Sequence, residues 1–312
     1  MHTTLEPAAP TGVVSDLTLT PSPSVPRQLP AWLAVAGVTV GARFAFQIQA
    51  LPLDLRAFGI PLACLLGYWL FVRFLEHREP SELRGGALSL GQFGVGLLLG
   101  LFRPGLVIAT GLTLGLITVQ SGQAGRHLLA VALFTAGSAF IQELLYRGLA
   151  LRYLELKLGS YAAIALSALI FALPHLVVIS GVSAIQLADF FVSGVALGCA
   201  YVLTRRLWLS IGMHVGHNVL IVLLFVNPLE TVPLVYFEPV GDGFWVRETG
   251  VELLWLMTSI LVAAGLLIAV VLRRAAVSAD QAWPAQLGAA RGPQQGAQTG
   301  SAVPPVVDTG AS

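Results

Sequence analysis

Runs of about 20 mostly apolar residues recur along this sequence, and a run of that length is enough for an α-helix to cross a bilayer. We recognise such runs at 31–50, 58–75, 90–120, 128–151, 160–178, 184–204, 207–226 and 251–272. The run 90–120 is too long for one straight crossing and contains Arg103-Pro104-Gly105. It predicts either one kinked, tilted helix or two short crossings. The fold expected is an all-α, polytopic transmembrane helix bundle.

Composition supports this expectation and excludes several other classes of protein. The 312 residues are 56% hydrophobic and only 11% charged, with a mean hydropathy of +0.80. Too few polar residues are present to cover a soluble fold, which excludes an ordinary cytosolic enzyme and a disordered protein. A net charge of +1 gives no basic field for nucleic acid. Cys64 and Cys199 both lie in apolar runs, which excludes a disulfide framework and a cysteine-based zinc site.

Both ends of the chain differ in composition from its centre. Residues 1–28 are rich in Pro, Ser and Thr and lack the pattern of a cleavable signal peptide, so we expect a disordered N-terminal tail. Residues 275–312 are rich in Gly, Ala, Pro and Gln and predict a disordered C-terminal tail. Residues 29–274 then form the transmembrane domain.

Charges between the apolar runs predict the topology. Basic residues follow the second, fourth, sixth and last runs, whereas the loop 227–250 is net acidic. The positive-inside rule places basic loops in the cytoplasm, which predicts about eight spans with both termini cytoplasmic if 90–120 crosses an odd number of times. Arg103 lies inside a run and has no evident partner. Glycine pairs one turn apart, Gly96/Gly100, Gly111/Gly115 and Gly194/Gly198, predict close helix packing or reflect the abundance of glycine in membrane helices.

Ionisable residues at membrane depth are costly, so each of them is a candidate functional residue. Glu143 and Arg147 are one helical turn apart in the fourth run and can pair on one face. Mutual neutralisation alone would explain how they survive in lipid, but not why they are placed there. His175 follows Pro174, which frees a backbone carbonyl upstream and favours a kink.

A third polar group lies in the run 207–226. His214 and Asn218 are one turn apart, and His217 lies nearby on the same side. A histidine and an asparagine on one face can bind a metal or hold and polarise an oxygen. Three separate spans would thus bring a carboxylate, imidazoles and an amide to one buried pocket, where they could activate a water directly or through a metal.

These residues resemble the CPBP family of intramembrane proteases, which includes the CAAX prenyl endopeptidases and the bacterial Abi-type proteins. The family pattern is Glu-Glu-x-x-x-Arg, then Phe-x-x-x-His, then His-x-x-x-Asn or Asp, each on a membrane helix. In this sequence Gln142-Glu143-x-x-x-Arg147, Phe171-x-x-x-His175 and His214-x-x-x-Asn218 match in order and spacing. The resemblance covers a motif core of roughly 128–222.

The resemblance implies a membrane metalloprotease-type hydrolase and a role for each motif residue. Glu143 and His175 would activate the attacking water, His214 and Asn218 would stabilise the oxyanion, and Arg147 would orient Glu143. If a divalent metal such as zinc takes part, its ligands would be Glu143, His175 and His214.

One position departs from the family pattern, because Gln142 occupies the place of the first glutamate. A glutamine can position a water but cannot accept its proton at neutral pH. Adjacent helix positions point about 100° apart, so Glu143 cannot replace that glutamate in an unchanged geometry.

Three functions are compatible with these residues. The first is an endopeptidase that cleaves a membrane-associated protein or peptide, in contact with membrane lipid and without nucleic acid, as a multi-pass protein of the plasma membrane. The second is a catalytically weak or inactive member acting as a membrane binding or immunity-type protein, which Gln142 favours. The third is a small-solute transporter, disfavoured because the charges do not recur in two inverted halves.

Overall fold

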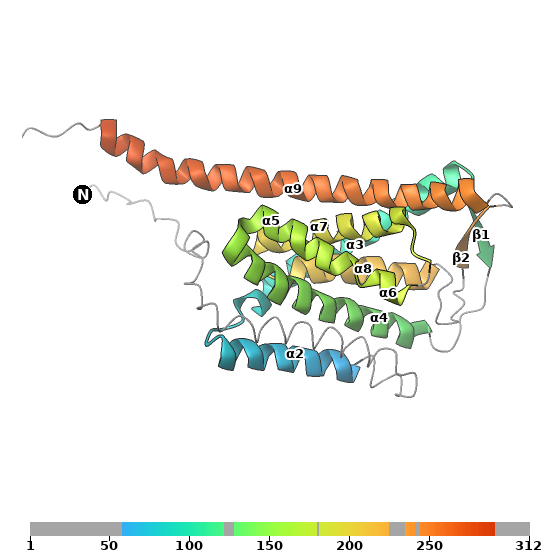
Figure 1. Ribbon diagram of the computed structural model, residues 1–312, viewed down its shortest axis with the longest axis horizontal. Coiled ribbons are helices and arrows are strands. Elements are labelled where there is room, and N and C mark those ends of the chain that lie inside the picture. Colours follow the sequence, from blue (N-terminus) through green and yellow to red (C-terminus); the bar gives the residue numbers. More distant parts are fainter. Residues whose placement is uncertain (1–57, 122–127, 180, 225–234, 241–243, 291–312) are drawn as a thin grey trace, which may run out of the picture. The chain divides into compact units, whose positions relative to one another are not determined.

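The chain is mostly helical in the computed structural model, which describes residues 58–121, 128–179, 181–224, 235–240 and 244–290 (Figure 1). It divides into two compact units, Met1–Val270 and Val271–Ser312. All residues of the candidate site belong to the first unit. The helices are α2 (Ile60–Leu70), η4 (Phe71–Leu75), η5 (Ser81–Leu83), α3 (Ala87–Thr113), α4 (Leu128–Glu143), η6 (Leu144–Leu151), α5 (Arg152–Ala172), α6 (His175–Val178), α7 (Ala184–Thr204), α8 (Trp208–Leu224) and α9 (Phe244–Ala290).

Four helical segments of the described chain are long and apolar enough to cross a membrane: Ala87–Thr113, Val131–Val177, Ala184–Thr204 and Thr249–Val277. Two shorter apolar helices span Ile60–Leu75 and Trp208–Leu224. Gly159, at φ 74°, interrupts the second long segment. The predicted run 31–50 lies outside the described residues. The helical membrane character is confirmed, whereas the number of about eight spans and the orientation of the termini stay predictions.

The run 90–120 forms one helix rather than two short crossings. Helix α3 continues through Pro104 and ends at Thr113, and Gly115 follows with φ 66°. Residues Ile117–Ser121 then form strand β1, which pairs antiparallel with β2 (Val235–Pro239). This small sheet corrects the all-α prediction. Its two strands lie far apart in the sequence, so the pairing leaves no local pattern to detect.

The C-terminal helix is longer than the sequence suggested. Helix α9 runs to Ala290, whereas we expected a disordered tail from residue 275. Residues 1–28 and 291–312, the other parts assigned to tails, lie outside the described residues.

Close packing between α3 and α8 places two walls of the candidate site. A Cβ atom added to Gly96 would lie 2.2 Å from the Leu209 carbonyl oxygen, and one on Gly212 would lie 2.3 Å from the Phe93 carbonyl oxygen. Gly100 approaches the Met213 carbonyl oxygen in the same way. The close packing predicted for the pair Gly96/Gly100 is therefore confirmed, and it lets the two backbones touch.

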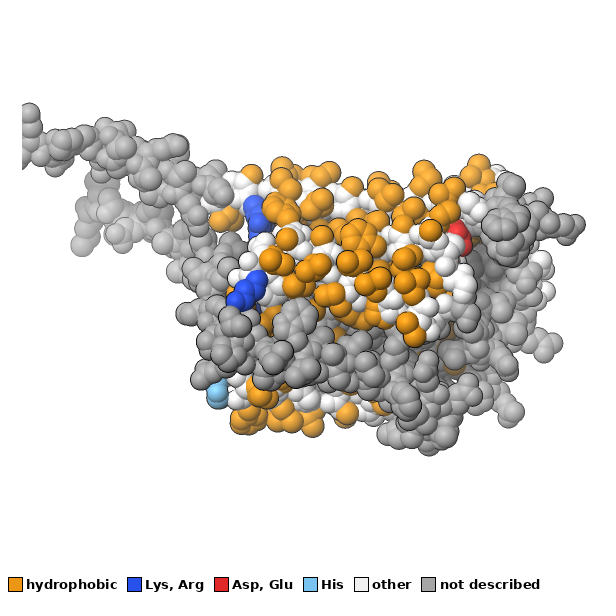
Figure 2. All heavy atoms as spheres, viewed as in Figure 1, with side chains coloured by type: hydrophobic (Ala, Val, Ile, Leu, Met, Phe, Trp, Pro, Cys, Tyr) orange, Lys and Arg blue, Asp and Glu red, His pale blue; other side chains and the backbone are white. Residues whose placement is uncertain are grey.

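The outer surface of the described chain is rich in exposed apolar side chains. Figure 2 shows hydrophobic side chains spread over the described part of one face, with few charged ones among them. Large exposed examples are Leu62, Leu66, Leu90, Leu98 and Val177. A continuous apolar surface of this kind is unfavourable in water and suits lipid. The exposed apolar side chains and the apolar composition thus both indicate an integral membrane protein.

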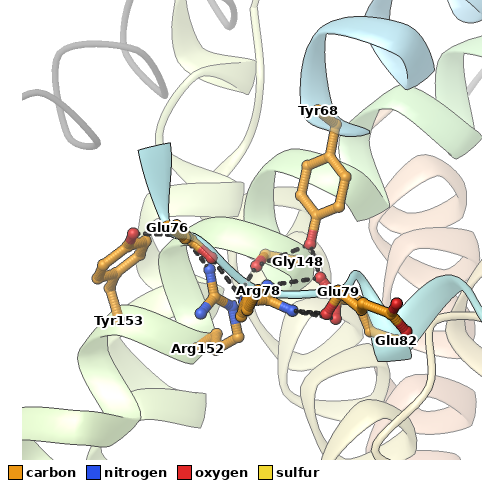
Figure 3. Close-up of polar contacts among 8 residues, drawn as sticks. All are labelled: Tyr68, Glu76, Arg78, Glu79, Glu82, Gly148, Arg152 and Tyr153. Atoms are coloured by element: carbon orange, nitrogen blue, oxygen red, sulfur yellow. Dashed lines mark hydrogen bonds and ion pairs between the residues drawn. The ribbon is translucent and has the colours of Figure 1, made fainter. Parts of the chain in front are cut away.

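A cluster of polar side chains anchors the segment that joins η4 to α3 (Figure 3). Arg78 donates hydrogen bonds to both carboxylate oxygens of Glu82, each at 2.7 Å, and one to Glu76 at 2.6 Å. The Tyr68 hydroxyl donates to the Glu82 carboxylate. Arg78 therefore ties two carboxylates of one short segment together and offsets their charges.

The same cluster reaches the helical turn that carries the first motif. Arg152 donates to the Gly148 carbonyl oxygen at 3.0 Å and to the Glu76 carboxylate. Close packing adds to this link, because a Cβ atom on Gly148 would lie 2.8 Å from the Tyr68 hydroxyl oxygen. The cluster thus fixes η6, a π-helical segment that directly follows Glu143.

Candidate active site

One cavity of about 120 Å³ lies among the helices of the first unit. A water occupies about 30 Å³ of liquid, so the space is sufficient for several waters or for a small part of a substrate. Three of the predicted site residues line it, namely His175, His214 and Asn218. Gln142 and His217 line it as well, whereas Glu143 and Arg147 are not among its lining residues.

Glu143 and Arg147 form an ion pair in the protein interior. Both side chains are fully buried, and Arg147 Nη1 donates to Glu143 Oε1 at 2.8 Å. Arg147 Nη2 donates to the Gly194 carbonyl oxygen of α7 at 3.0 Å. The predicted pairing is present, and Arg147 orients Glu143. Glu143 is not among the residues that line the cavity. This position argues against the expected role of Glu143 as the base that takes a proton directly from the attacking water.

His214 connects the buried carboxylate to the cavity. Its Nδ1 atom lies 2.8 Å from Glu143 Oε1. A carboxylate only accepts hydrogen bonds, so Nδ1 carries the hydrogen and Nε2 holds the lone pair in the neutral ring. Glu143 therefore acts on the cavity through His214, whose tautomer and orientation it fixes.

His175 is held in a similar way by the backbone. Its Nδ1 atom lies 3.1 Å from the Phe171 carbonyl oxygen and 3.2 Å from that of Ala172. These carbonyls belong to the last residues of α5, which ends at Ala172, two positions before Pro174. Both partners are acceptors, so Nδ1 again carries the hydrogen and Nε2 the lone pair. Pro174 lacks the N–H that would bond the Ile170 carbonyl, four positions upstream, so the Phe171 and Ala172 carbonyls are not the one that Pro174 frees. The freed carbonyl stays a prediction, whereas the break in the helix is present, because α5 ends at Ala172 and α6 begins at His175.

The Phe171 ring separates the two imidazoles and covers the buried cation. Its centroid lies 5.3 Å from that of His175 and 5.6 Å from that of His214. The Arg147 guanidinium lies 4.8 Å from the same centroid. The Phe190 ring stacks on His175 at 4.1 Å. These contacts give both imidazoles defined positions in a mainly apolar wall.

Gln142 faces the cavity that its neighbour Glu143 does not reach. Its amide nitrogen donates to the Ser138 hydroxyl at 3.0 Å. Successive helix positions point about 100° apart, which explains why one side chain lines the cavity and the next is buried behind it. A neutral amide thus occupies the cavity position of this helix.

A second polar group in the cavity wall was only partly anticipated. Arg103 Nη2 donates to both carboxylate oxygens of Asp189, at 2.7 and 2.5 Å, and Nη1 donates to Ser193 at 2.8 Å. Ser259 donates to Asp189 Oδ1 at 2.5 Å. No partner for Arg103 was predicted from the sequence, and Asp189 was not among the predicted site residues. An acidic residue inside the apolar run 184–204 was the signal that could have found it.

The expected metal ligands do not fit a shared ion in this arrangement. Among the residues that the structure describes, no three His, Cys, Asp or Glu side chains are grouped to hold one. Glu143 Oε1 already accepts from Arg147 and from His214. The Nδ1 atom of His175 faces backbone carbonyls. We therefore derive no chemical step through a metal.

Comparison with known proteins gives one match. Residues 124–220 match a protein-family model described as type II CAAX prenyl endopeptidase Rce1-like. No curated protein and no solved structure matches the chain. The matched segment contains all three motifs, at 142–147, 171–175 and 214–218, and it covers less than half of the chain. Residues 124–220 are therefore an Rce1-like segment, which confirms the resemblance to the CPBP family drawn from the three motifs.

Proposed function

We propose that this protein is a membrane-embedded endopeptidase that hydrolyses a peptide bond of a membrane-associated protein or peptide. The observation that carries the proposal is the pair of imidazoles, His175 and His214, that line one cavity with their Nδ1 atoms already engaged. The neutral His175 ring then keeps its lone pair on Nε2, whereas His214, once protonated from bulk water, presents an Nε2–H donor. The Rce1-like match supports the protease class.

His175 is the proposed general base. Its Nε2 lone pair takes a proton from a water held beside Gln142, and the water oxygen forms a bond to the substrate carbonyl carbon. Gln142 contributes an amide that positions the water but takes no proton. This assignment differs from the role that the family resemblance implies for Glu143, because Gln142 and His175 line the cavity and Glu143 does not.

Asn218 and His214 are the proposed oxyanion partners. The Asn218 amide donates to the oxygen that gains charge, and His214 does so in its imidazolium form. The Glu143 carboxylate at 2.8 Å stabilises that imidazolium, and Arg147 holds the carboxylate in place. When the carbon–nitrogen bond breaks, the proton on His175 passes to the leaving nitrogen. His175 is then neutral again, and the products are an acid and an amine.

Reconstitution of the full chain in lipid nanodiscs with a mixed peptide library, followed by mass spectrometry of the fragments, tests this function. We expect defined fragments from the wild type and about 10²–10⁴-fold slower cleavage by His175→Ala, the usual cost of losing a general base. Cys64→Ala is the control, because Cys64 is not among the residues that line the cavity. Absence of cleavage by the wild type across the library would contradict the proposal.

Gln142 favours a second candidate function, a non-catalytic membrane binding or immunity-type protein. In such a protein the cavity would hold a ligand without hydrolysing it, because the side chain at this wall cannot take a proton. Peptide binding without any fragment, in the same nanodiscs, is the result that this candidate predicts.

A further inference from the structure

Polar contacts bring three separate segments of the chain together around the cluster shown in Figure 3. The Leu207 N–H donates to the Glu82 carbonyl oxygen at 3.0 Å. Arg205 Nη2 donates to the Glu155 carboxylate at 3.0 Å. These contacts join three ranges into one region, which we call the basic end: 71–90, 152–161 and 201–208.

The basic end carries more positive than negative charge. It contains seven basic residues, Arg73, Arg78, Arg84, Arg152, Lys157, Arg205 and Arg206, against the four acidic residues Glu76, Glu79, Glu82 and Glu155. Three of the acidic side chains are already paired within the region, with Arg78, Arg152 and Arg205. Glu79 is exposed. The acidic residues therefore leave an excess of cations.

Four basic side chains of the basic end have no acidic partner in the described part of the chain. Arg73, Arg84 and Lys157 are exposed, and Arg206 is half-buried. Arg206 Nη1 donates to the Ser89 hydroxyl at 3.2 Å, and Ser89 in turn donates to the Arg84 carbonyl oxygen at 2.5 Å. Two arginines are thus held near each other with no carboxylate between them. Like charges repel, so an anion that binds here is attracted by both.

Exposed apolar side chains accompany these cations in the sequence. Each exposed cation has an apolar residue that is more than half exposed within four positions, and the pairs are Arg73 with Phe74, Lys157 with Leu158, and Arg84 with Leu88. An acidic soluble protein would satisfy the cations and leave the apolar side chains in water. A phospholipid satisfies both, because its phosphate carries negative charge and its acyl chains cover apolar surface.

Trp208 belongs to the same region and supports a position at the level of the headgroups. Its indole N–H donates to the Arg84 carbonyl oxygen at 3.1 Å. Tryptophan is enriched where a membrane protein meets the interface between lipid and water, since its ring is apolar and its N–H is polar.

We propose that the basic end binds the headgroups of anionic phospholipids, with four side chains as the phosphate contacts: Arg73, Arg84, Lys157 and Arg206. Guanidinium and ammonium groups form charge-assisted hydrogen bonds to phosphate oxygens. The exposed side chains are accessible to a lipid without any rearrangement of the fold. None of the four lines the cavity, so this interaction goes beyond the proposed endopeptidase function and does not depend on it.

Competition between two lipids that differ only in their headgroups tests the proposal. The full chain in detergent micelles is mixed with equal amounts of phosphatidylglycerol and phosphatidylcholine with identical acyl chains, and native mass spectrometry counts the bound molecules of each. We expect more bound phosphatidylglycerol at low ionic strength and a smaller preference as salt is raised, because salt screens exposed charges. Equal binding of the two lipids at low ionic strength would overturn the proposal.

Variants identify the side chains that carry the preference. The triple variant Arg73→Gln/Arg84→Gln/Lys157→Gln should lower the ratio of bound phosphatidylglycerol to phosphatidylcholine by up to about fivefold for each cation removed. Arg73→Lys/Arg84→Lys keeps both charges and should keep most of the preference. Glu79→Gln removes the exposed acid and should raise it. An unchanged ratio in the triple variant, at an unchanged melting temperature, would exclude this surface. If the triple variant does not fold, the single variant Lys157→Gln and the salt series on the wild type give the decision.

An acidic soluble partner is the competing occupant of the basic end. Fluorescein-labelled polyglutamate is therefore titrated onto the full chain in nanodiscs of phosphatidylcholine alone. Polyglutamate binding that the triple variant loses, together with equal binding of the two lipids, would assign the surface to an acidic polypeptide and overturn the lipid proposal. Glycerol phosphate added to the lipid competition separates a lipid from a free phosphate, and the phosphatidylglycerol preference should survive it. None of these measurements requires cleavage, so failure of the lipid proposal is distinct from failure of the endopeptidase.

Discussion

His214 Nδ1 lies 2.8 Å from Glu143 Oε1, and this contact joins two motifs that are 71 positions apart in the chain. It places a buried carboxylate behind an imidazole that lines the cavity. A carboxylate in this position fixes the tautomer of the ring and stabilises its protonated form. In the proposed function, Glu143 is therefore a positioning residue for His214, and Arg147 supports Glu143.

Glu143→Gln should lower both stability and turnover. The substitution leaves the Arg147 cation buried without its partner, which typically costs about 3–5 kcal/mol. It also removes the negative charge that stabilises the His214 imidazolium, although the amide oxygen can still accept a hydrogen bond. Thermal unfolding and peptide turnover measured on the same purified variant give the two effects.

The double variant Glu143→Gln/Arg147→Met separates these effects. Removing the cation together with the carboxylate should recover most of the lost stability, because no unpaired charge remains. Turnover should stay low, since His214 still lacks its carboxylate. A double variant that regains both stability and turnover would show that Glu143 serves only to neutralise Arg147.

Gly96→Leu should destabilise the pair of helices α3 and α8. Even a Cβ atom at this position would lie 2.2 Å from the Leu209 carbonyl oxygen, so the two backbones must move apart. Overpacking typically costs about 1–3 kcal/mol, and separation of the helices would add to this. Gly94→Leu is the control, because a Cβ atom there meets nothing within 4 Å. Equal melting temperatures for the two variants would contradict the close approach.

The sequence predicted the helices and the motif residues well because their signals are local. Apolar runs marked the positions of α3, α7 and α8, and the spacing of the second and third motifs marked His175, His214 and Asn218, which share a cavity. Pairing of β1 with β2 depends on residues more than a hundred positions apart, and no periodicity reports it.

The direction of each side chain was harder to predict than its presence. Spacing placed Gln142 and Glu143 on one helical turn, but only the packing of α4 against α8 and of η6 against α7 decides which one faces the cavity. The partner of Arg103 lay on another helix, at Asp189. Such contacts follow from helix packing, which a single sequence does not specify.

Glu82→Gln should lower thermal stability at neutral pH and matter less in acid. Burial alone would raise the pKa of Glu82, but hydrogen bonds and charge from Arg78 outweigh burial and lower it. A lowered pKa means that the carboxylate stabilises the fold above its unfolded value of about 4.3, and that this stability is lost as the pH falls through the folded value. Melting temperatures from pH 7 down to pH 4 and below should show the gap between wild type and variant closing. The exposed Glu79→Gln serves as control, and a gap that widened in acid would reverse the sign.

Gln142→Glu should increase proteolysis. Position 142 lines the cavity, so a carboxylate there would reach the attacking water directly, which Glu143 does not do in this arrangement. It would add a proton acceptor beside His175 and restore the paired glutamates of the family pattern. Gln142→Ala should instead cost only the positioning of the water and reduce turnover less than His175→Ala. Initial rates on one fluorogenic peptide, chosen from the fragments that the wild type releases, compare the three variants. Cleavage that falls on Gln142→Glu would show that the amide itself is needed at this wall. No cleavage in either wild type or Gln142→Glu would favour the non-catalytic function.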